Sequence, residues 1–252
     1  MSKLNRSINV HVQSGGSAIV GADLNYLSIG DAFIPQEASI LIGIDDENGF
    51  PLNNHEPEHA GNISFEICNL DTLDEVLDGS PLDIECLCDE LGFPEYLLRT
   101  IELLLDPDKY QQICRTLGMK QIHQVVDIKL VMLTEEFRGN EIGAEAIKVL
   151  MKSIGSTSSL FMLGPVPVQL TSNFFDQLDD DMAKTMFDVF IGGLKHDGVA
   201  AIEHLAGHLR KHGYKTMYEL AGTHVRHDEY PQCEVMYIPA VTKEQKQNKR
   251  AA

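Results

Sequence analysis

The sequence predicts an α+β (α/β) fold with a mixed, mostly antiparallel central sheet and flanking helices, and three stretches carry this prediction. The N-terminal quarter alternates apolar and polar residues with the period of two that half-buried strands show. Asp71 to about Leu117 instead repeats its apolar residues at helical spacing. Ile128 to Met151 runs from an apolar strand through a turn into an amphipathic helix.

The composition is that of a soluble globular protein, with 252 residues, 43% of them apolar and 23% charged. No apolar run reaches the roughly 18 residues that a membrane helix needs, and the polar N-terminus lacks the apolar core of a signal peptide. Five cysteines without regular spacing fit reduced thiols better than a disulfide framework. We therefore expect a cytoplasmic protein with no membrane partner.

The chain is strongly acidic, with a formal net charge of −18 and a pI of about 4.8. Such a field repels nucleic acid and favours cationic partners, although an ordinary acidic cytosolic protein has the same composition. We expect no nucleic-acid partner. A diphosphate ligand would need a locally basic site.

The N-terminal quarter predicts an antiparallel meander. Its strand signals are the stretches 8–12, 38–44 and 63–68, with 18–20 as a shorter candidate. Asn48-Gly49 supplies a turn signal, and Pro51 to Gly61 is a polar loop.

That loop holds His55-Glu56-Pro57-Glu58-His59, which formally matches the H-E-x-x-H pattern of zinc proteases. The chemistry needs both histidines one turn apart on a helix. Pro57 would fall inside that helix, and no apolar periodicity flanks the segment. We therefore predict a loop here and assign no metal.

The helical block from Asp71 to about Leu117 is divided by Gly79-Ser80-Pro81 and Gly92-Phe93-Pro94. Together with the meander it forms a first region, residues 1–117, either a separate unit or a part of the same domain as the rest. After it the chain returns to a strand at Ile122 to Leu133.

A helix is predicted from Ile142 to about Ser153, and its start suits an anion. The first backbone N–H groups of a helix have no intrahelical partner and carry the positive end of its dipole. Gly139 and Gly143 remove Cβ atoms where a ligand would approach, and Arg138 adds a fixed positive charge.

Arg138-Gly139-Asn140-Glu141-Ile142-Gly143, placed after an apolar strand, resembles the acyl-CoA-binding signature of the GCN5-related N-acetyltransferase (GNAT) family, (Gln/Arg)-x-x-Gly-x-(Gly/Ala). Arg138 matches the first position and Gly143 the last. Glu141 stands where the family prefers glycine. An ordinary strand–turn–helix corner has the same local pattern, so the downstream sequence carries part of the argument.

Downstream, an apolar strand at 160–163 is followed by Pro165 and Pro167, which restrict it to an edge or to diverging strands. In the acetyltransferase fold the corresponding strand splays from its neighbour and leaves a cleft for the pantetheine arm. Helices are predicted at 174–190 and 198–212, strands at 215–220 and 234–238, and a disordered tail at 241–252.

A second resemblance lies in Leu209-Arg210-Lys211-His212-Gly213-Tyr214, a helix end with a Gly-aromatic pair leading into a strand, as in the late segment of the family. The resemblance therefore covers about residues 122–240, in a predicted acetyltransferase-like region 118–240. It implies an acyl-CoA N-acyltransferase-like fold with extra N-terminal β and helical elements. Many family members carry a tyrosine four residues before that glycine, as general acid, and here the position is Leu209.

The helix that ends at His212 also presents His204, His208 and His212 on one face, at i, i+4 and i+8. Imidazole is a common zinc ligand, but two histidines one helical turn apart usually need an acidic partner from elsewhere in the chain. We favour a mixed polar face and assign no metal to these residues.

The resemblance implies an N-acetyltransferase that moves an acetyl group from acetyl-CoA, its co-substrate, to an amine of an acceptor that is a small molecule or a protein. Catalysis would come from positioning, a general base and polarisation of the carbonyl. Glu135 or Glu136 would be the base, and Tyr218 or His208 the acid. The residues expected to hold acetyl-CoA are Val131, Met132, Leu133, Arg138, Gly139, Asn140, Glu141, Ile142 and Gly143.

A different class of function fits the same sequence: an acetyltransferase-like fold without catalysis that serves as an acidic binding or interaction protein. Glu141 in the diphosphate turn, Leu209 at the acid position and the acidic surface favour it. A homodimer is an arrangement that the sequence leaves open.

Overall fold

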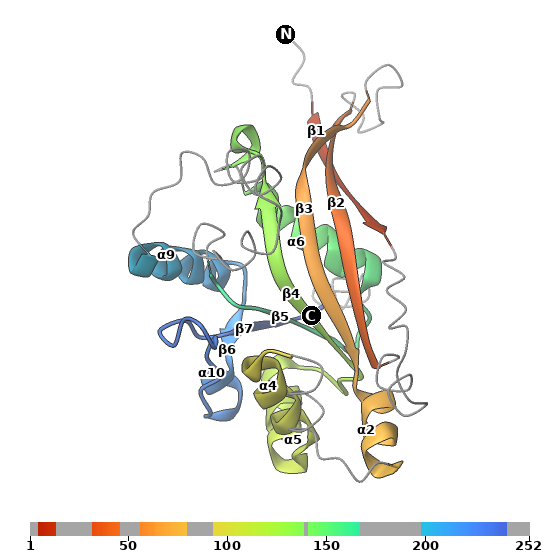
Figure 1. The fold of residues 1–252 in the computed structure, drawn as a ribbon, viewed down its shortest axis with the longest axis vertical. Helices are drawn as coiled ribbons and strands as arrows, with labels where there is room; N and C mark the ends of the chain where they lie inside the picture. Colours follow the sequence, from red (N-terminus) through yellow and green to blue (C-terminus); the bar gives the residue numbers. More distant parts are fainter. Residues whose placement is uncertain are drawn as a thin grey trace, which may run out of the picture.

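In the computed structural model, residues 5–13, 32–45, 56–79, 93–138, 141–166 and 198–240 are described. Seven strands form one open sheet in the order β1-β2-β3-β4-β5-β7-β6 (Figure 1). The strands are β1 (Asn5–Gln13), β2 (Phe33–Asp45), β3 (Glu58–Asn69), β4 (Gln124–Leu133), β5 (Ser159–Leu163), β6 (Lys215–Thr216) and β7 (Met236–Pro239). Among these strands only β4 and β5 run parallel, so the predicted mixed, mostly antiparallel α+β sheet is confirmed.

Helices lie on both faces of this sheet. They are α2 (Leu70–Gly79), α4 (Glu95–Leu105), α5 (Pro107–Leu117), the 3₁₀ turn η1 (Glu135–Phe137), α6 (Ile142–Ile154), α9 (Gly198–Lys211) and α10 (Met217–Ala221). Figure 1 shows α6 crossing behind the long strands, whereas α2, α4 and α5 gather towards their lower ends. Strands from both predicted regions, 1–117 and 118–240, share the one sheet.

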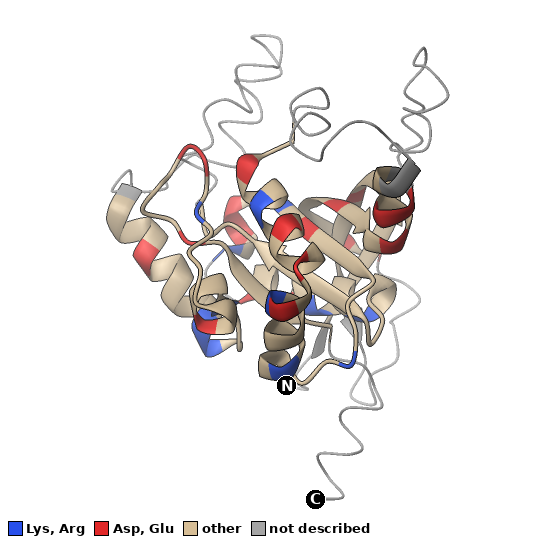
Figure 2. Ribbon diagram, turned by 90° about the horizontal axis from the view of Figure 1, so that it is seen from below, with Lys and Arg blue, Asp and Glu red and all other residues tan. Residues whose placement is uncertain are grey.

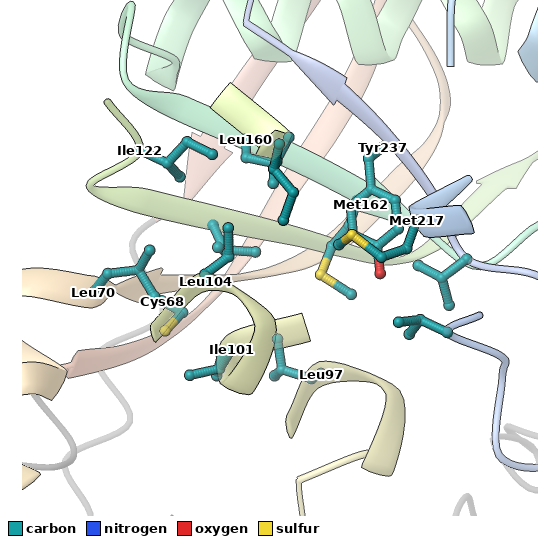
Figure 3. Packing of buried hydrophobic residues seen from close by; sticks show 14 of the residues in the cluster. Cys68, Leu70, Leu97, Ile101, Leu104, Ile122, Leu160, Met162, Met217 and Tyr237 are labelled. Carbon is teal, nitrogen blue, oxygen red and sulfur yellow. The ribbon is translucent and has the colours of Figure 1, made fainter. Parts of the chain in front are cut away.

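The strands β4 and β5 are covered on both faces, which is why they lack the simple alternation of a half-exposed strand. Val125 belongs to a core with α2, α4, α5 and α10, whereas its neighbour Val126 belongs to a second core with α6 and α9. All five residues of β5 are buried. Figure 3 shows the first core, where Leu97, Ile101 and Leu104 of α4 face Leu160 and Met162 of β5.

The predicted N-terminal meander is confirmed over β1, β2 and β3, which pair antiparallel in sequence order. The pairing of β2 with β3 slips by one residue at Ala60, because Ile40 lies opposite Gly61 and Leu41 opposite His59. His59 is the second residue of β3, and a strand here excludes the helix that a zinc-protease motif would need. His55 lies outside the described residues.

The predicted helical block from Asp71 to Leu117 is confirmed where it is described, as α2, α4 and α5. Asp106 begins α5, because its side chain accepts hydrogen bonds from the backbone N–H groups of Asp108 and Lys109 at 2.9 and 3.1 Å. Gly118 ends the helix in the left-handed conformation, with φ of 68°.

Replacing Asp106 with alanine should lower the free energy of unfolding by about 1 kcal/mol, because two backbone N–H groups at the helix start lose their acceptor. Urea unfolding would measure the change. Asp74→Ala on α2, at an exposed position, is the control and should stay within about 0.5 kcal/mol of the unsubstituted protein. Equal losses for the two variants would contradict the capping role of Asp106.

The predicted strand 215–220 is wrong beyond Thr216, where α10 begins. Thr216 accepts a hydrogen bond from the N–H of Glu219, and the Glu219 carboxylate accepts one from the N–H of Thr216. This reciprocal capping box starts the helix and Gly222 ends it, so local hydrogen bonds override the strand-forming composition. The segments 18–20, 174–190 and 241–252, predicted as strand, helix and tail, lie outside the described residues.

None of the helices in the described ranges is long and apolar enough to cross a membrane. Acidic residues are spread along many elements of the ribbon, with fewer basic residues between them (Figure 2). The negative charge of the composition therefore does not gather on one element.

Candidate functional site

The strand β4 is longer than its parallel neighbour β5 and continues past the end of it. Pairing of β4 with β5 runs from Gln124 opposite Ser159 to Ile128 opposite Leu163. Beyond Ile128, β4 continues to Leu133 and pairs only with β3 among the described strands. The chain after Leu163 turns away at Gly164, whose carbonyl accepts a 2.7 Å hydrogen bond from the N–H of Val166.

A cleft of about 450 Å³ lies beyond the end of β5, beside the part of β4 that β5 does not reach. Four elements line it: the end of β4, the first turns of α6, the end of β5 with the residues after it, and one face of α9. Its lining residues are Lys129, Leu130, Val131, Leu133, Glu141, Ile142, Gly143, Ala144, Ile147, Leu163, Gly164, Val166, His204, Leu205, His208 and Leu209. The walls are mostly apolar and carry a few polar groups, as small-molecule sites do.

The start of α6 faces into the cleft. The first intrahelical hydrogen bond joins the N–H of Glu145 to the carbonyl of Glu141 at 3.0 Å, so the N–H groups of 142–144 precede the helical ladder. A Cβ added to Gly143 would lie 3.5 Å from the Leu133 side chain and 3.7 Å from that of Val131. The absent side chain at Gly143 thus leaves room between the helix start and the end of β4.

Glu141 precedes this helix in an unusual backbone conformation. Its φ is 60° and its ψ is 7°, and it is the non-glycine residue with positive φ in the described part of the chain. The family signature prefers glycine here, and glycine adopts this conformation without steric cost. The backbone therefore keeps a glycine-like shape although the side chain is a carboxylate.

Arg138 lies just before the turn, and its Nε donates a 3.0 Å hydrogen bond to the carbonyl of Leu133. The arginine therefore ties the chain back onto the end of β4. Phe137 is buried beside it and anchors the short turn η1 in the core with α6. Gly139 and Asn140, the next two residues of the predicted site, lie outside the described residues.

The other residues predicted to hold the cofactor lie on β4 and at the start of α6, and successive side chains of β4 point to opposite faces of the sheet. Val131 and Leu133 line the cleft, and Ile142 and Gly143 line it from the helix. Met132 is buried and is not among the lining residues. A contact from Met132 would thus come from its backbone.

The predicted catalytic residues lie in different places. Glu135 and Glu136 are exposed on η1 and are not among the residues that line the cleft. Tyr218 is 54% exposed in the first turn of α10, where its ring stacks on His224 with centroids 4.5 Å apart. His208 does line the cleft, and so does Leu209, the apolar residue at the family's acid position.

A buried polar group in β4 was not predicted from the sequence. Asp127 is 1% exposed, and one of its carboxylate oxygens accepts a 3.0 Å hydrogen bond from the Tyr96 hydroxyl. Its other oxygen has no hydrogen-bond partner among the described residues. Burial raises the pKa of Asp127 to about 7. An aspartate within the run Val125-Val126-Asp127-Ile128 was the signal that could have found it.

Next to Asp127, an ion pair joins β3 and β4. The Lys129 ammonium lies 3.0 Å from a carboxylate oxygen of Glu66, which is largely buried. Lys129 also lines the cleft and partly offsets the effect of burial on the Asp127 carboxyl. The lysine among the lining residues is therefore already paired with a carboxylate.

The fold and the site define a mixed α+β protein that has an open, mostly antiparallel sheet and a mostly apolar cleft beside the end of β4. Comparison with protein-family models, with curated proteins and with solved structures finds no match to this chain.

Proposed function

We propose that the protein is an acyl-CoA-dependent N-acetyltransferase, which moves an acetyl group from acetyl-CoA to an amine. One observation carries the proposal: the cleft lies beside β4 just beyond the end of its parallel neighbour β5, with the first turn of α6 in its wall. The family resemblance implied a splayed strand pair and a helix start at this point of the chain. The acyl-CoA N-acyltransferase-like fold is part of the same proposal.

The diphosphate of acetyl-CoA would lie at the start of α6. Backbone N–H groups there carry partial positive charge and lack intrahelical acceptors, so they can donate to phosphate oxygens. Glu141 and the missing side chain of Gly143 set the shape of this corner. Arg138 would act through the turn that it holds against Leu133.

The pantetheine arm would follow the edge of β4 that β5 leaves, between Lys129 and Leu133. Backbone N–H and C=O groups of a strand edge can pair with the amides of an extended ligand, as an added strand would. Val131, Leu163 and Leu205 would cover the arm with apolar side chains. The acetyl carbonyl oxygen would accept a hydrogen bond from a backbone N–H of β4, which polarises the thioester.

In the transfer step the amine nitrogen attacks the thioester carbonyl carbon, a C–N bond forms, the C–S bond breaks and the thiolate leaves. The proton from the amine goes to a general base. Glu135 and Glu136 stay our predictions for that base, acting through water, because both are exposed near the strand end. Leu209 lines the cleft at the family's acid position and cannot protonate the sulfur, so CoA leaves as the thiolate.

Acetyl-CoA should stabilise the protein against heat. A ligand that binds only the folded state, at a hundred times its Kd, adds about 2.7 kcal/mol to the free energy of unfolding. A thermal-shift titration measures this directly. An unchanged melting temperature at millimolar acetyl-CoA would exclude the enzyme.

Gly143→Val should abolish that stabilisation, because the added side chain enters the space between the helix start and β4. The matched control is Gly207→Val on α9, where an added Cβ meets nothing within 4 Å and the residue does not line the cleft. The control should keep the shift. A full shift in Gly143→Val would place the acetyl-CoA site elsewhere.

The second candidate function is a binding protein that keeps the fold without the chemistry, and Leu209 at the acid position favours it. Release of free CoA from acetyl-CoA in the presence of a panel of primary amines separates the two functions. Binding together with release supports the enzyme. Binding without release from any amine of the panel supports the binding protein.

A further inference from the structure

Three ligand-type side chains converge at the start of α6, from two separate parts of the chain. They are Glu141, before α6, and His208 and His212, in the last turn and at the end of α9. One potential ligand atom of each lies within 4.8 Å of those of the other two. A carboxylate and two imidazoles at this separation can close on one ion with small side-chain rotations.

The two histidines owe their proximity to helical geometry. Residues four apart lie on the same face of a helix, and the rings of His208 and His212 approach edge to face with centroids 4.6 Å apart. His204, one turn earlier, is exposed and is not part of the group of three. The acidic partner that a histidine pair needs comes from a loop 67 residues earlier than His208.

The backbone of Glu141 is a second, independent observation. A non-glycine residue at φ of 60° carries steric strain, and such residues tend to cluster where a side chain has a function. The strain does not arise from capping, because the Glu141 side chain makes no capping hydrogen bond to α6. The conformation instead places the Glu141 carboxylate near the two histidines. A glycine at this position would have no side chain to act as a ligand.

We propose that Glu141, His208 and His212 bind a divalent transition-metal ion, and that the ion is Zn²⁺. Two imidazole nitrogens and one carboxylate oxygen are a ligand set that zinc takes in open sites, where the fourth position is left for water or another ligand. Hard cations such as Mg²⁺ and Ca²⁺ prefer sites made of oxygen atoms alone.

One lysine beside the site is paired with a carboxylate of its own helix. Lys148 lies on α6 and affects His212 electrostatically, but its ammonium is 2.5 Å from a carboxylate oxygen of Glu145. Glu145 offsets the charge of the lysine in that ion pair. The negative charge of the proposed site therefore comes from Glu141 itself.

The position of the ion gives it a role. Glu141 and His208 line the cleft, whereas His212 lines a neighbouring cavity of about 380 Å³. An ion there would neutralise Glu141 at the helix start and offer its free position to an anionic oxygen, such as one of a diphosphate. This role rests on the proposed function, but the binding of Zn²⁺ does not.

The test titrates Zn²⁺ alone, without acetyl-CoA, into tag-free protein in competition with a chromophoric chelator. We expect one Zn²⁺ per chain. Glu141→Gln, His208→Asn and His212→Asn should each weaken binding by at least about tenfold, since even partners outside the first ligand shell are worth roughly 10–100-fold. His204→Asn, from the same helix, should bind as the unsubstituted protein does.

Two further variants separate a loss of the ligand from a loss of the fold, and this site from the cysteines. Glu141→Gly suits the positive φ, so it should melt no lower than the unsubstituted protein without metal and yet lose Zn²⁺ binding. The double variant Cys86→Ser with Cys88→Ser should keep binding, because the sequence pair Cys86-Leu87-Cys88 is not among the proposed ligands.

Three results would each overturn the proposal. They are no Zn²⁺ bound by the unsubstituted protein, binding that survives in a folded Glu141→Gly, and equal losses in His204→Asn and His208→Asn. Because acetyl-CoA is absent, failure of the proposed enzyme leaves this test unaffected.

Discussion

Asp127→Asn should make the protein more stable at alkaline pH, and the gain should reach about 4 kcal/mol relative to the unsubstituted protein. In the native state the Asp127 carboxyl has a pKa of about 7, because the side chain is fully buried, against an ordinary value of 3.8. Each unit between the two corresponds to about 1.4 kcal/mol. Asparagine keeps the shape and an acceptor for the Tyr96 hydroxyl but does not ionise.

The direction of the pH effect follows from which state holds the proton. Between pH 3.8 and about 7 the unfolded chain loses the Asp127 proton while the native protein keeps it. The free energy of unfolding therefore falls as the pH rises through this window. The stability that the raised pKa contributes is fully present below pH 3.8 and is lost as the pH passes about 7. Asp127→Asn lacks this fall.

Urea unfolding of both proteins at several pH values from 4 to 8 measures the difference. Asp74→Asn, an exposed carboxylate on α2, is the control and should follow the unsubstituted protein in parallel. A stability difference between Asp127→Asn and the unsubstituted protein that does not change with pH would contradict the buried, protonated carboxyl.

Gly61→Ala should lower the free energy of unfolding by about 3–5 kcal/mol, because overpacking and backbone strain act together at one residue. The φ of Gly61 is 156°, and an added Cβ would lie 1.9 Å from the carbonyl oxygen of Met132. Since Gly61 pairs with Leu133, the clash falls between β3 and the end of β4 that lines the cleft. Acetyl-CoA affinity should fall with stability.

The matched control is Gly118→Ala. Its φ of 68° also disfavours a side chain, but nothing lies within 4 Å of the added Cβ. The loss there should be limited to the strain of a left-handed residue, about 1 kcal/mol. Urea unfolding would measure both losses. Equal losses at Gly61 and Gly118 would show that a side chain at Gly61 does not clash with the backbone of β4.

Local signals predicted much of the fold. The period-two stretches indicated β1 to β3, and the apolar spacing between Asp71 and Leu117 indicated the helices, because these features depend on neighbours in sequence. The strand predicted at 215–220 failed because the capping box of Thr216 and Glu219 competes with strand-forming composition over only a few residues. Short elements of this kind are decided by single hydrogen bonds.

The candidate site was only partly predictable, because its walls meet through the tertiary fold. The strand end and the helix start adjoin in sequence, so Val131, Leu133 and Gly143 were found. The face that α9 adds, and the approach of Glu141 to His208, depend on how helices pack on the sheet. The histidine spacing was visible in the sequence, whereas its acidic partner was not.

Hydrogen–deuterium exchange of the whole chain, with and without acetyl-CoA, tests whether the cleft binds this ligand. We expect slower exchange of backbone N–H groups in 129–133 and 142–145, where the end of β4 and the start of α6 line the cleft. We expect no change in α4 and α5, which pack in the other core. Protection confined to α4 and α5, or no protection at saturating acetyl-CoA, would contradict binding in the cleft.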